Sequence, residues 1–213
     1  MQTLLFQGDS ITDGKRFREN DDYRGSGYAN LVSAQLMYEK PGAYRCVNRG
    51  VSGNRVLDVY ARIRCDIENV QPDVMSLLIG INDVWHENND HNGVPQPRFE
   101  KVLDLLVSDL LTSLPQMKLM LLEPFVLHGT ATCATPENPG RWHDFSTQTP
   151  MRAAAVRAVA ERYRLPFLAL QADFTRLAAE TCAENWLLDG VHPSAMGHEI
   201  IAEAVCEAME AKF

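Results

Sequence analysis

The stretch TLLFQGDSIT, residues 3–12, decides the fold. Its first half is mostly apolar over five residues, as in a strand that a sheet buries on both faces. Gly8 lets the backbone turn sharply, and Ser10 just beyond it is then held on a rigid element with its hydroxyl toward a cleft. The ordinary alternative is that Ser10 only caps the N-terminus of a helix. In either case the stretch predicts a buried strand followed by a polar turn.

Four further segments have the character of the first strand, which we place at residues 3–7. They are residues 44–48, 73–79, 117–123 and 166–170. Amphipathic segments with the three- and four-residue spacing of a helix face alternate with them, at residues 28–38, 56–67, 99–114, 151–163 and 194–209. Five successive strand-and-helix units predict an α/β fold, in which a five-stranded parallel sheet is covered by helices on both faces.

Length and composition indicate one globular domain, residues 1–213, with 46% hydrophobic and 23% charged residues. The net charge of −8 disfavours nucleic acid as a partner, because an acidic surface repels phosphates. No segment approaches the ~18 apolar residues of a membrane helix, and no basic segment precedes the first apolar run. We therefore expect a cytoplasmic protein with no membrane partner. The five widely spaced cysteines predict free thiols and no disulfide framework.

Polar clusters follow the first three predicted strands, where a parallel sheet of this kind binds its ligand. After Ser10, the second cluster is NRGVSGN, in which Gly50 and Gly53 can expose backbone N–H groups to an oxyanion. The third is GIND, in which the Asn82 amide can donate to the same point. Each cluster taken alone is equally compatible with a tight turn or an Asx-turn.

A histidine with a nearby aspartate lies close to the C-terminus, in the sequence DGVHP. Asp189 precedes His192 by three residues and can accept the Nδ1–H of the imidazole, which leaves Nε2 free as a base. A local structural hydrogen bond is the alternative. The ordered position of all four clusters favours a catalytic site.

These four blocks resemble those of the SGNH hydrolases, also called GDSL esterases, in order and across nearly the whole chain. Within that family the blocks, together with LEPF at residues 122–125 and DGVHPSAMGH at residues 189–198, are most similar to intracellular bacterial acetylxylan esterases. The resemblance implies a three-layer, flavodoxin-like α/β/α sandwich and a serine esterase that uses no metal or cofactor. Leu188 stands where some relatives have an aromatic residue. This difference affects what we expect of the acyl pocket and leaves the expected catalytic residues unchanged.

The resemblance also implies roles for single residues. Ser10 is expected to be the nucleophile, His192 the base and Asp189 the residue that orients it. The oxyanion hole is expected to consist of the backbone N–H groups of Ser10 and Gly53 and the side chain of Asn82. The implied substrate is a small acyl ester of a carbohydrate, such as an acetylated xylo-oligosaccharide. A lysophospholipase or thioesterase, or a catalytically silent carbohydrate-binding protein, are the alternatives.

Substrate contacts are expected from Asp9, Arg55 and Trp85, which lie within or next to the motif blocks; an aromatic face beside a guanidinium suits a sugar ring. A surface ion pair and a core tryptophan are the ordinary alternatives for the last two. The segment 124–149 is far longer than the usual connection of about 2–6 residues. We interpret it as a loop that forms a site wall or a contact in a homo-oligomer.

One segment resembles a zinc motif. His86 and His91 are five positions apart, whereas H-E-x-x-H needs histidines four apart on one helix face. We interpret the two histidines as part of a loop rich in asparagine and glycine, which includes Gly93, and expect no metal there.

Overall fold

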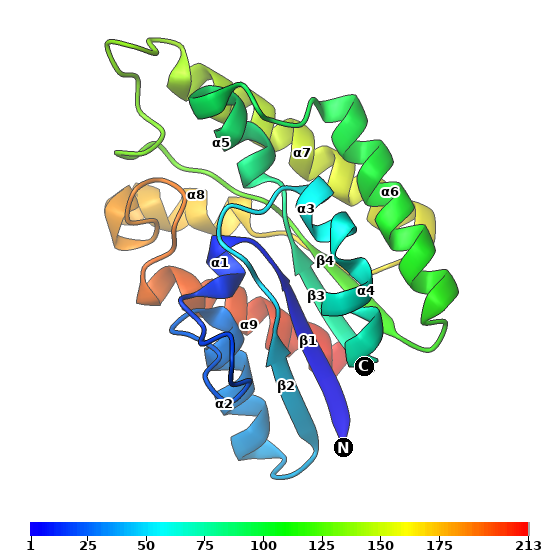
Figure 1. The fold of residues 1–213 in the computed structure, drawn as a ribbon. Helices are drawn as coiled ribbons and strands as arrows, with labels where there is room; N and C mark the ends of the chain where they lie inside the picture. Colours follow the sequence, from blue (N-terminus) through cyan, green and yellow to red (C-terminus); the bar gives the residue numbers. More distant parts are fainter. Residues whose placement is uncertain (213) are drawn as a thin grey trace.

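A five-stranded parallel sheet forms the middle layer of the molecule (Figure 1). The computed structural model describes residues 1–212. The strands are β1 (Gln2–Gly8), β2 (Tyr44–Asn48), β3 (Val74–Leu78), β4 (Lys118–Leu122) and β5 (Phe167–Leu168). Their order in the sheet is β2-β1-β3-β4-β5, and every neighbouring pair is parallel. This is the flavodoxin-like order, in which the chain reverses direction across the sheet between β1 and β3. The expected three-layer fold is confirmed.

Helices cover both faces of the sheet (Figure 1). They are α1 (Ser10–Asp13), α2 (Tyr28–Glu39), α3 (Val56–Ala61), α4 (Ile63–Asp66), α5 (Ile81–Asp90), α6 (Gln96–Ser113), α7 (Arg141–Tyr163), α8 (Gln171–Glu180) and α9 (Ala195–Lys212), with short 3-10 turns η1 (Glu68–Val70) and η2 (Ala183–Asn185). One core lies between the sheet and helices α2, α8 and α9, and the other lies between the sheet and helices α3, α6 and α7. Within residues 1–212 no helix is both long and apolar enough to cross a membrane.

Alternation along β1 explains why its sequence is apolar at successive positions. Leu4 and Phe6 belong to the core beneath α2 and α9, and Leu5 between them belongs to the core beneath α3 and α6. All three side chains are fully buried. Successive side chains of a strand point to opposite faces, so a strand covered on both sides needs an apolar residue at every position.

Several parts of the structure differ from the prediction. The helix expected at residues 56–67 is divided into α3 and α4, and α8 had no predicted counterpart. The expected loop 124–149 ends early, because α7 begins at Arg141 and continues through Pro150. Proline normally interrupts a helix, but the buried Phe145 anchors the first turns of α7 in the core.

The segment after β3 is also helical where the sequence predicts a loop. Gly80 has a φ of 134°, and this turn starts α5 directly after the strand. Residues 81–90 are therefore helical, and His91 ends the helix in the left-handed conformation. The loop expected at residues 86–91 is thus the second half of a helix, so its residues lie on definite faces.

Candidate active site

Ser10 lies at the carboxyl end of β1, in the first turn of α1. Asp9, not Ser10, is the N-cap: its Oδ1 accepts a hydrogen bond of 3.0 Å from the N–H of Ile11. The Ser10 hydroxyl is therefore not used as a cap, and its Oγ lies 3.0 Å from Nε2 of His192. A Cβ on Gly8 would lie 2.3 Å from the carbonyl oxygen of Leu78, so only glycine allows the end of β1 to approach β3 this closely.

His192 is held from the other side by Asp189. Its Nδ1 lies 2.7 Å from Oδ2 of Asp189, so the Nδ1–H donates to the carboxylate and Nε2 faces Ser10. Oδ1 of Asp189 accepts from the N–H groups of Val191 and His192, at 2.9 and 2.8 Å. Four hydrogen bonds thus fix a chain that runs from carboxylate to imidazole to hydroxyl.

The electrostatics follow from this chain. Burial acts to raise the pKa of Asp189, but the hydrogen bonds from the His192 side chain and from two backbone N–H groups outweigh it and hold the pKa at about 2. The hydrogen bond to Asp189 raises the pKa of His192 above 6.5, against the opposing effect of burial. At neutral pH Asp189 is therefore ionised, and an imidazolium would be stabilised.

A cavity of about 350 Å³ opens at these groups and is lined by Ser10, Gly53, Asn82 and His192, among others. Gly53 has a φ of 83°, a conformation that favours glycine. Asn82 lies in the first turn of α5 and is largely buried. The structure thus brings four of the residues singled out in the sequence to one cavity. Side-chain amides and backbone N–H groups in such a place can stabilise a negatively charged oxygen.

Two residues of α5 that sequence reasoning missed hold the loop around Gly53. Nε2 of His86 lies 2.9 Å from the carbonyl oxygen of Gly53 and donates to it. Both oxygens of Asp83 accept from the N–H of Val56, at 3.2 Å. Asn82 adds a 3.1 Å bond from its Nδ2 to the carbonyl oxygen of Asn54. Asn82 and His86 are four residues apart, a spacing that places two side chains on the same face of a helix. The spacing could not be used from the sequence, because this segment was not predicted to be helical.

Trp85 also lines the cavity. Its ring centroid is 5.6 Å from that of His192, and its ring meets Phe145 edge-on at 5.8 Å. This side chain is partly buried in the core and partly a cavity wall, and its contact with a substrate stays a prediction.

Asp9 and Arg55 are not placed with the other groups. Asp9 is 1% exposed, its carboxylate faces the interior, and it is not among the residues that line the cavity at Ser10. Its burial follows from its capping position at the start of α1. Arg55 forms an ion pair with Asp58 and donates to the carbonyl oxygen of Asn92, and it is not among the residues that line the cavity at Ser10.

Two buried carboxyl groups lie beneath the site. Burial raises the pKa of Asp9 to about 7 and that of Asp83 to about 8. Oδ2 of Asp9 has no hydrogen-bond partner in the described part of the chain. Within that same part, no group of three histidine, cysteine, aspartate or glutamate side chains is arranged to hold a metal ion.

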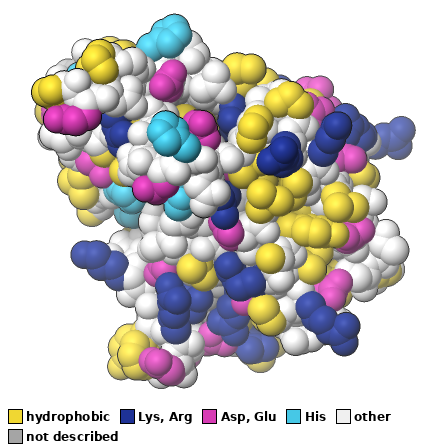
Figure 2. All heavy atoms as spheres, turned by 45° about the horizontal axis from the view of Figure 1, so that its top comes forward, with side chains coloured by type: hydrophobic (Ala, Val, Ile, Leu, Met, Phe, Trp, Pro, Cys, Tyr) yellow, Lys and Arg dark blue, Asp and Glu magenta, His cyan; other side chains and the backbone are white. Residues whose placement is uncertain are grey.

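The face that carries the site is rich in histidine. Figure 2 brings the carboxyl ends of the strands forward and shows histidine side chains gathered at this end, with lysine and arginine side chains mostly on the lower part of the same face. Arginines are paired in the structure, for example Arg49 and Arg45 with Asp21.

The fold agrees with the comparisons to known proteins. Residues 6–200 match the GDSL-like lipase/acylhydrolase family. An acetylxylan esterase of Geobacillus stearothermophilus is 33% identical over 95% of this chain and 91% of its own length. A crystal structure of an acetylxylan esterase from that organism matches with a TM-score of 0.83 and 32% identity, covering 100% of this chain and 94% of the other. An α/β hydrolase enzyme from the metagenome of Lake Arreo matches with a TM-score of 0.82 and 30% identity, covering 98% and 95%. The chain therefore belongs to the GDSL-like lipase/acylhydrolase family and is a carboxylic-ester hydrolase.

Proposed function

We propose that this protein removes acetyl groups from carbohydrates such as short xylo-oligosaccharides, with Ser10, His192 and Asp189 as a catalytic triad. The observation that carries the proposal is the continuous hydrogen-bonded chain from Asp189 Oδ2 through both ring nitrogens of His192 to Ser10 Oγ, at 2.7 and 3.0 Å. A serine hydroxyl attacks an ester at neutral pH only if a base removes its proton during the attack.

The first half of the reaction forms an acyl-enzyme. Ser10 Oγ attacks the ester carbon while Nε2 of His192 takes its proton, and the carbonyl oxygen becomes an oxyanion. The tetrahedral intermediate collapses when the bond to the sugar oxygen breaks, and His192 returns the proton to that oxygen. Asp189 stabilises the imidazolium in between.

In the second half, water repeats the attack on the acetyl-Ser10 ester. His192 again removes a proton, the bond to Ser10 Oγ breaks, and acetate leaves with the proton returned to Ser10. In both halves the oxyanion is held by the N–H groups of Ser10 and Gly53 and by the Asn82 amide. Each such donor is worth roughly 3 kcal/mol in the transition state.

Two observations support a small acyl group on a sugar. The cavity of about 350 Å³ at Ser10 is near the lower end of the volumes of ligand sites, and Trp85 forms part of its wall. An acetylxylan esterase is 33% identical to this chain. An aromatic wall beside polar groups suits a sugar ring, which has both apolar faces and hydroxyl groups.

The function is tested by substrate comparison and active-site labelling. We expect p-nitrophenyl acetate to be hydrolysed much faster than p-nitrophenyl octanoate, and acetate to be released from acetylated xylose and xylo-oligosaccharides. A preference for octanoate would instead indicate a lysophospholipase or thioesterase. A fluorophosphonate should label the wild type and fail to label Ser10→Ala; labelling of the variant would show that Ser10 is not the nucleophile.

A further inference from the structure

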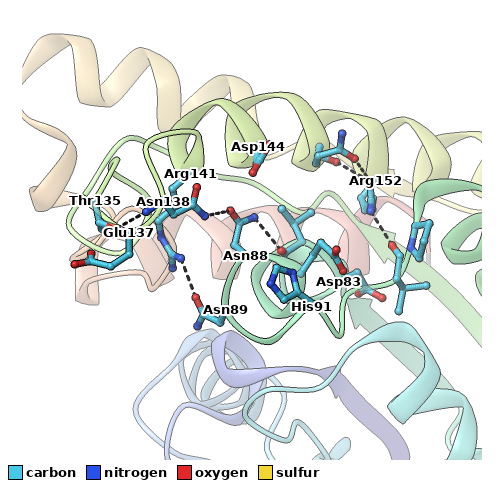
Figure 3. A pocket seen from close by; sticks show the side chains of 15 residues that line it. Asp83, Asn88, Asn89, His91, Thr135, Glu137, Asn138, Arg141, Asp144 and Arg152 are labelled. Atoms are coloured by element: carbon cyan, nitrogen blue, oxygen red, sulfur yellow. Dashed lines mark hydrogen bonds between the residues drawn. The ribbon is translucent and has the colours of Figure 1, made fainter.

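A second and larger cavity, of about 900 Å³, lies between α5 and α7 (Figure 3). It is lined by the face of α5 that carries Asp83, Glu87 and Asn88. The cavity at Ser10 is lined by a different face of the same helix, with Asn82, Trp85 and His86. Helix α5 therefore separates the two cavities, and the proposed reaction uses only the smaller one.

The walls of the large cavity carry several polar groups. Arg152 is 4% exposed, and its two terminal nitrogens donate to Gln148 and to the carbonyl oxygen of Val94, so its role is to hold the wall. Asp144 extends from α7 toward α5 (Figure 3), and its carboxylate makes no hydrogen bond or ion pair with the residues described. Nearby, Nδ2 of Asn138 donates to Oδ1 of Asn88 at 3.0 Å. A carboxylate without a protein partner and two amide side chains thus line the same space.

These groups favour a neutral ligand with many hydroxyl groups. A hydroxyl both donates and accepts, so it can donate to Asp144 and accept from the amide and guanidinium N–H groups of Asn138 and Arg141, which line the same cavity. Acidic and basic side chains are both present in the wall, since Asp144 and Glu137 occur together with Arg141 and Arg152. A strongly charged ligand of either sign would meet a like charge in this wall. A carbohydrate has the required chemistry.

The two cavities meet at the C-terminal end of α5, where Asn89 lines both of them. Arg141 joins the two sides here: it donates to Oδ1 of Asn89 at 2.8 Å, and its guanidinium lies over the Trp85 ring at 5.9 Å. A helix with its side chains is about 10–12 Å wide. A ligand that reaches from Ser10 into the large cavity must therefore be longer than a single sugar.

We infer that the cavity between α5 and α7 is a carbohydrate subsite that holds the unreacted end of an oligosaccharide ester whose acetyl group lies at Ser10. The inference rests on the proposed function. Such a subsite makes the enzyme selective for oligosaccharides over monosaccharides, although the residues that form the subsite touch no reacting atom.

The test fills the subsite and leaves the catalytic residues intact. Asp144→Trp places a bulky side chain in the large cavity, and Thr147→Trp places the same side chain at an exposed position of α7 that does not line it. We expect Asp144→Trp to raise KM for acetylated xylotetraose by about tenfold or more. A change of this size corresponds to the loss of at least one charge-assisted hydrogen bond. KM for acetylated xylose and the rate on p-nitrophenyl acetate should not change, and Thr147→Trp should behave as the wild type.

Direct binding gives a second readout. In a Ser10→Ala background, calorimetry should detect binding of unacetylated xylotetraose that Asp144→Trp weakens to the same extent. Asp144→Asn keeps the size of the side chain and removes its charge, so it serves if the tryptophan variant does not fold; it should weaken binding as well. Unchanged xylotetraose binding and unchanged KM in both variants would overturn the inference. Hydrolysis of p-nitrophenyl acetate in the same samples shows separately whether the proposed esterase function holds.

Discussion

His86 donates a 2.9 Å hydrogen bond from Nε2 to the carbonyl oxygen of Gly53. It connects α5 to the loop whose N–H group we place in the oxyanion hole. His86→Ala removes this contact, and we expect kcat on p-nitrophenyl acetate to fall about tenfold with little change in KM, because a slightly displaced donor stabilises the transition state less well. His143→Ala, an exposed histidine on α7, is the control. A change in KM alone would mean that His86 contacts substrate and does not position Gly53.

Asn82 is expected to contribute more than His86, because its amide would donate to the oxyanion itself. Asn82→Ala should lower kcat by about 10²- to 10³-fold while the protein remains folded. The loss of its bond to the carbonyl oxygen of Asn54 should appear only as a modest decrease in Tm. Steady-state kinetics together with a thermal melt measure both effects. Nearly wild-type kcat would remove Asn82 from the oxyanion hole.

The pH profile reports on His192. Its pKa is raised by the hydrogen bond to Asp189, and the base must be neutral to take the proton of Ser10. We therefore expect kcat/KM to fall as the pH drops through a value above 6.5. In Asp189→Asn this inflection should move to lower pH, and the rate should fall by up to about 10⁴-fold as in other triads. A wild-type rate that stays constant down to pH 4 would exclude His192 as the base.

The buried Asp9 should make stability depend on pH in the opposite sense to a salt-bridged carboxylate. Its pKa is 3.8 in the unfolded chain and about 7 in the folded protein. Between these values the unfolded state loses the proton first, so stability falls as pH rises, and the loss is complete above about pH 7. Asp9→Asn keeps a side-chain oxygen for the Ile11 N–H and cannot ionise. We expect its gain in Tm over the wild type to be at least about 4 °C larger at pH 8 than at pH 4. An equal difference at both pH values would contradict the raised pKa.

The sheet could be predicted almost entirely from the sequence, since β1 and its neighbours are buried on both faces and each appears as a short apolar run. Residues 44–48 were predicted to the residue, and β3 and β4 within one residue at each end. The start of α7 could not be found in this way. Pro150 interrupts the local pattern, and only the packing of Phe145 in the core shows that the helix begins earlier.

The candidate site was predicted in outline. Ser10, Gly53 and Asn82 follow three successive strands, and parallel strands bring their carboxyl ends together. The role of α5 was missed because its polar sequence after Trp85 has the composition of a loop. The burial of Asp9 was missed for a related reason, since sequence alone does not tell whether a carboxylate beside a cleft serine faces the cleft or the helix behind it.

The contact between Ser10 and His192 has a consequence for how the enzyme is made. These residues are 182 positions apart in the chain, and the histidine immediately precedes α9, which packs against α2. During synthesis Ser10 is therefore made early, but His192, its proposed base, leaves the ribosome only when most of the chain has been translated. With the roles proposed for Ser10 and His192, a chain truncated before residue 192 is expected to carry an inert serine.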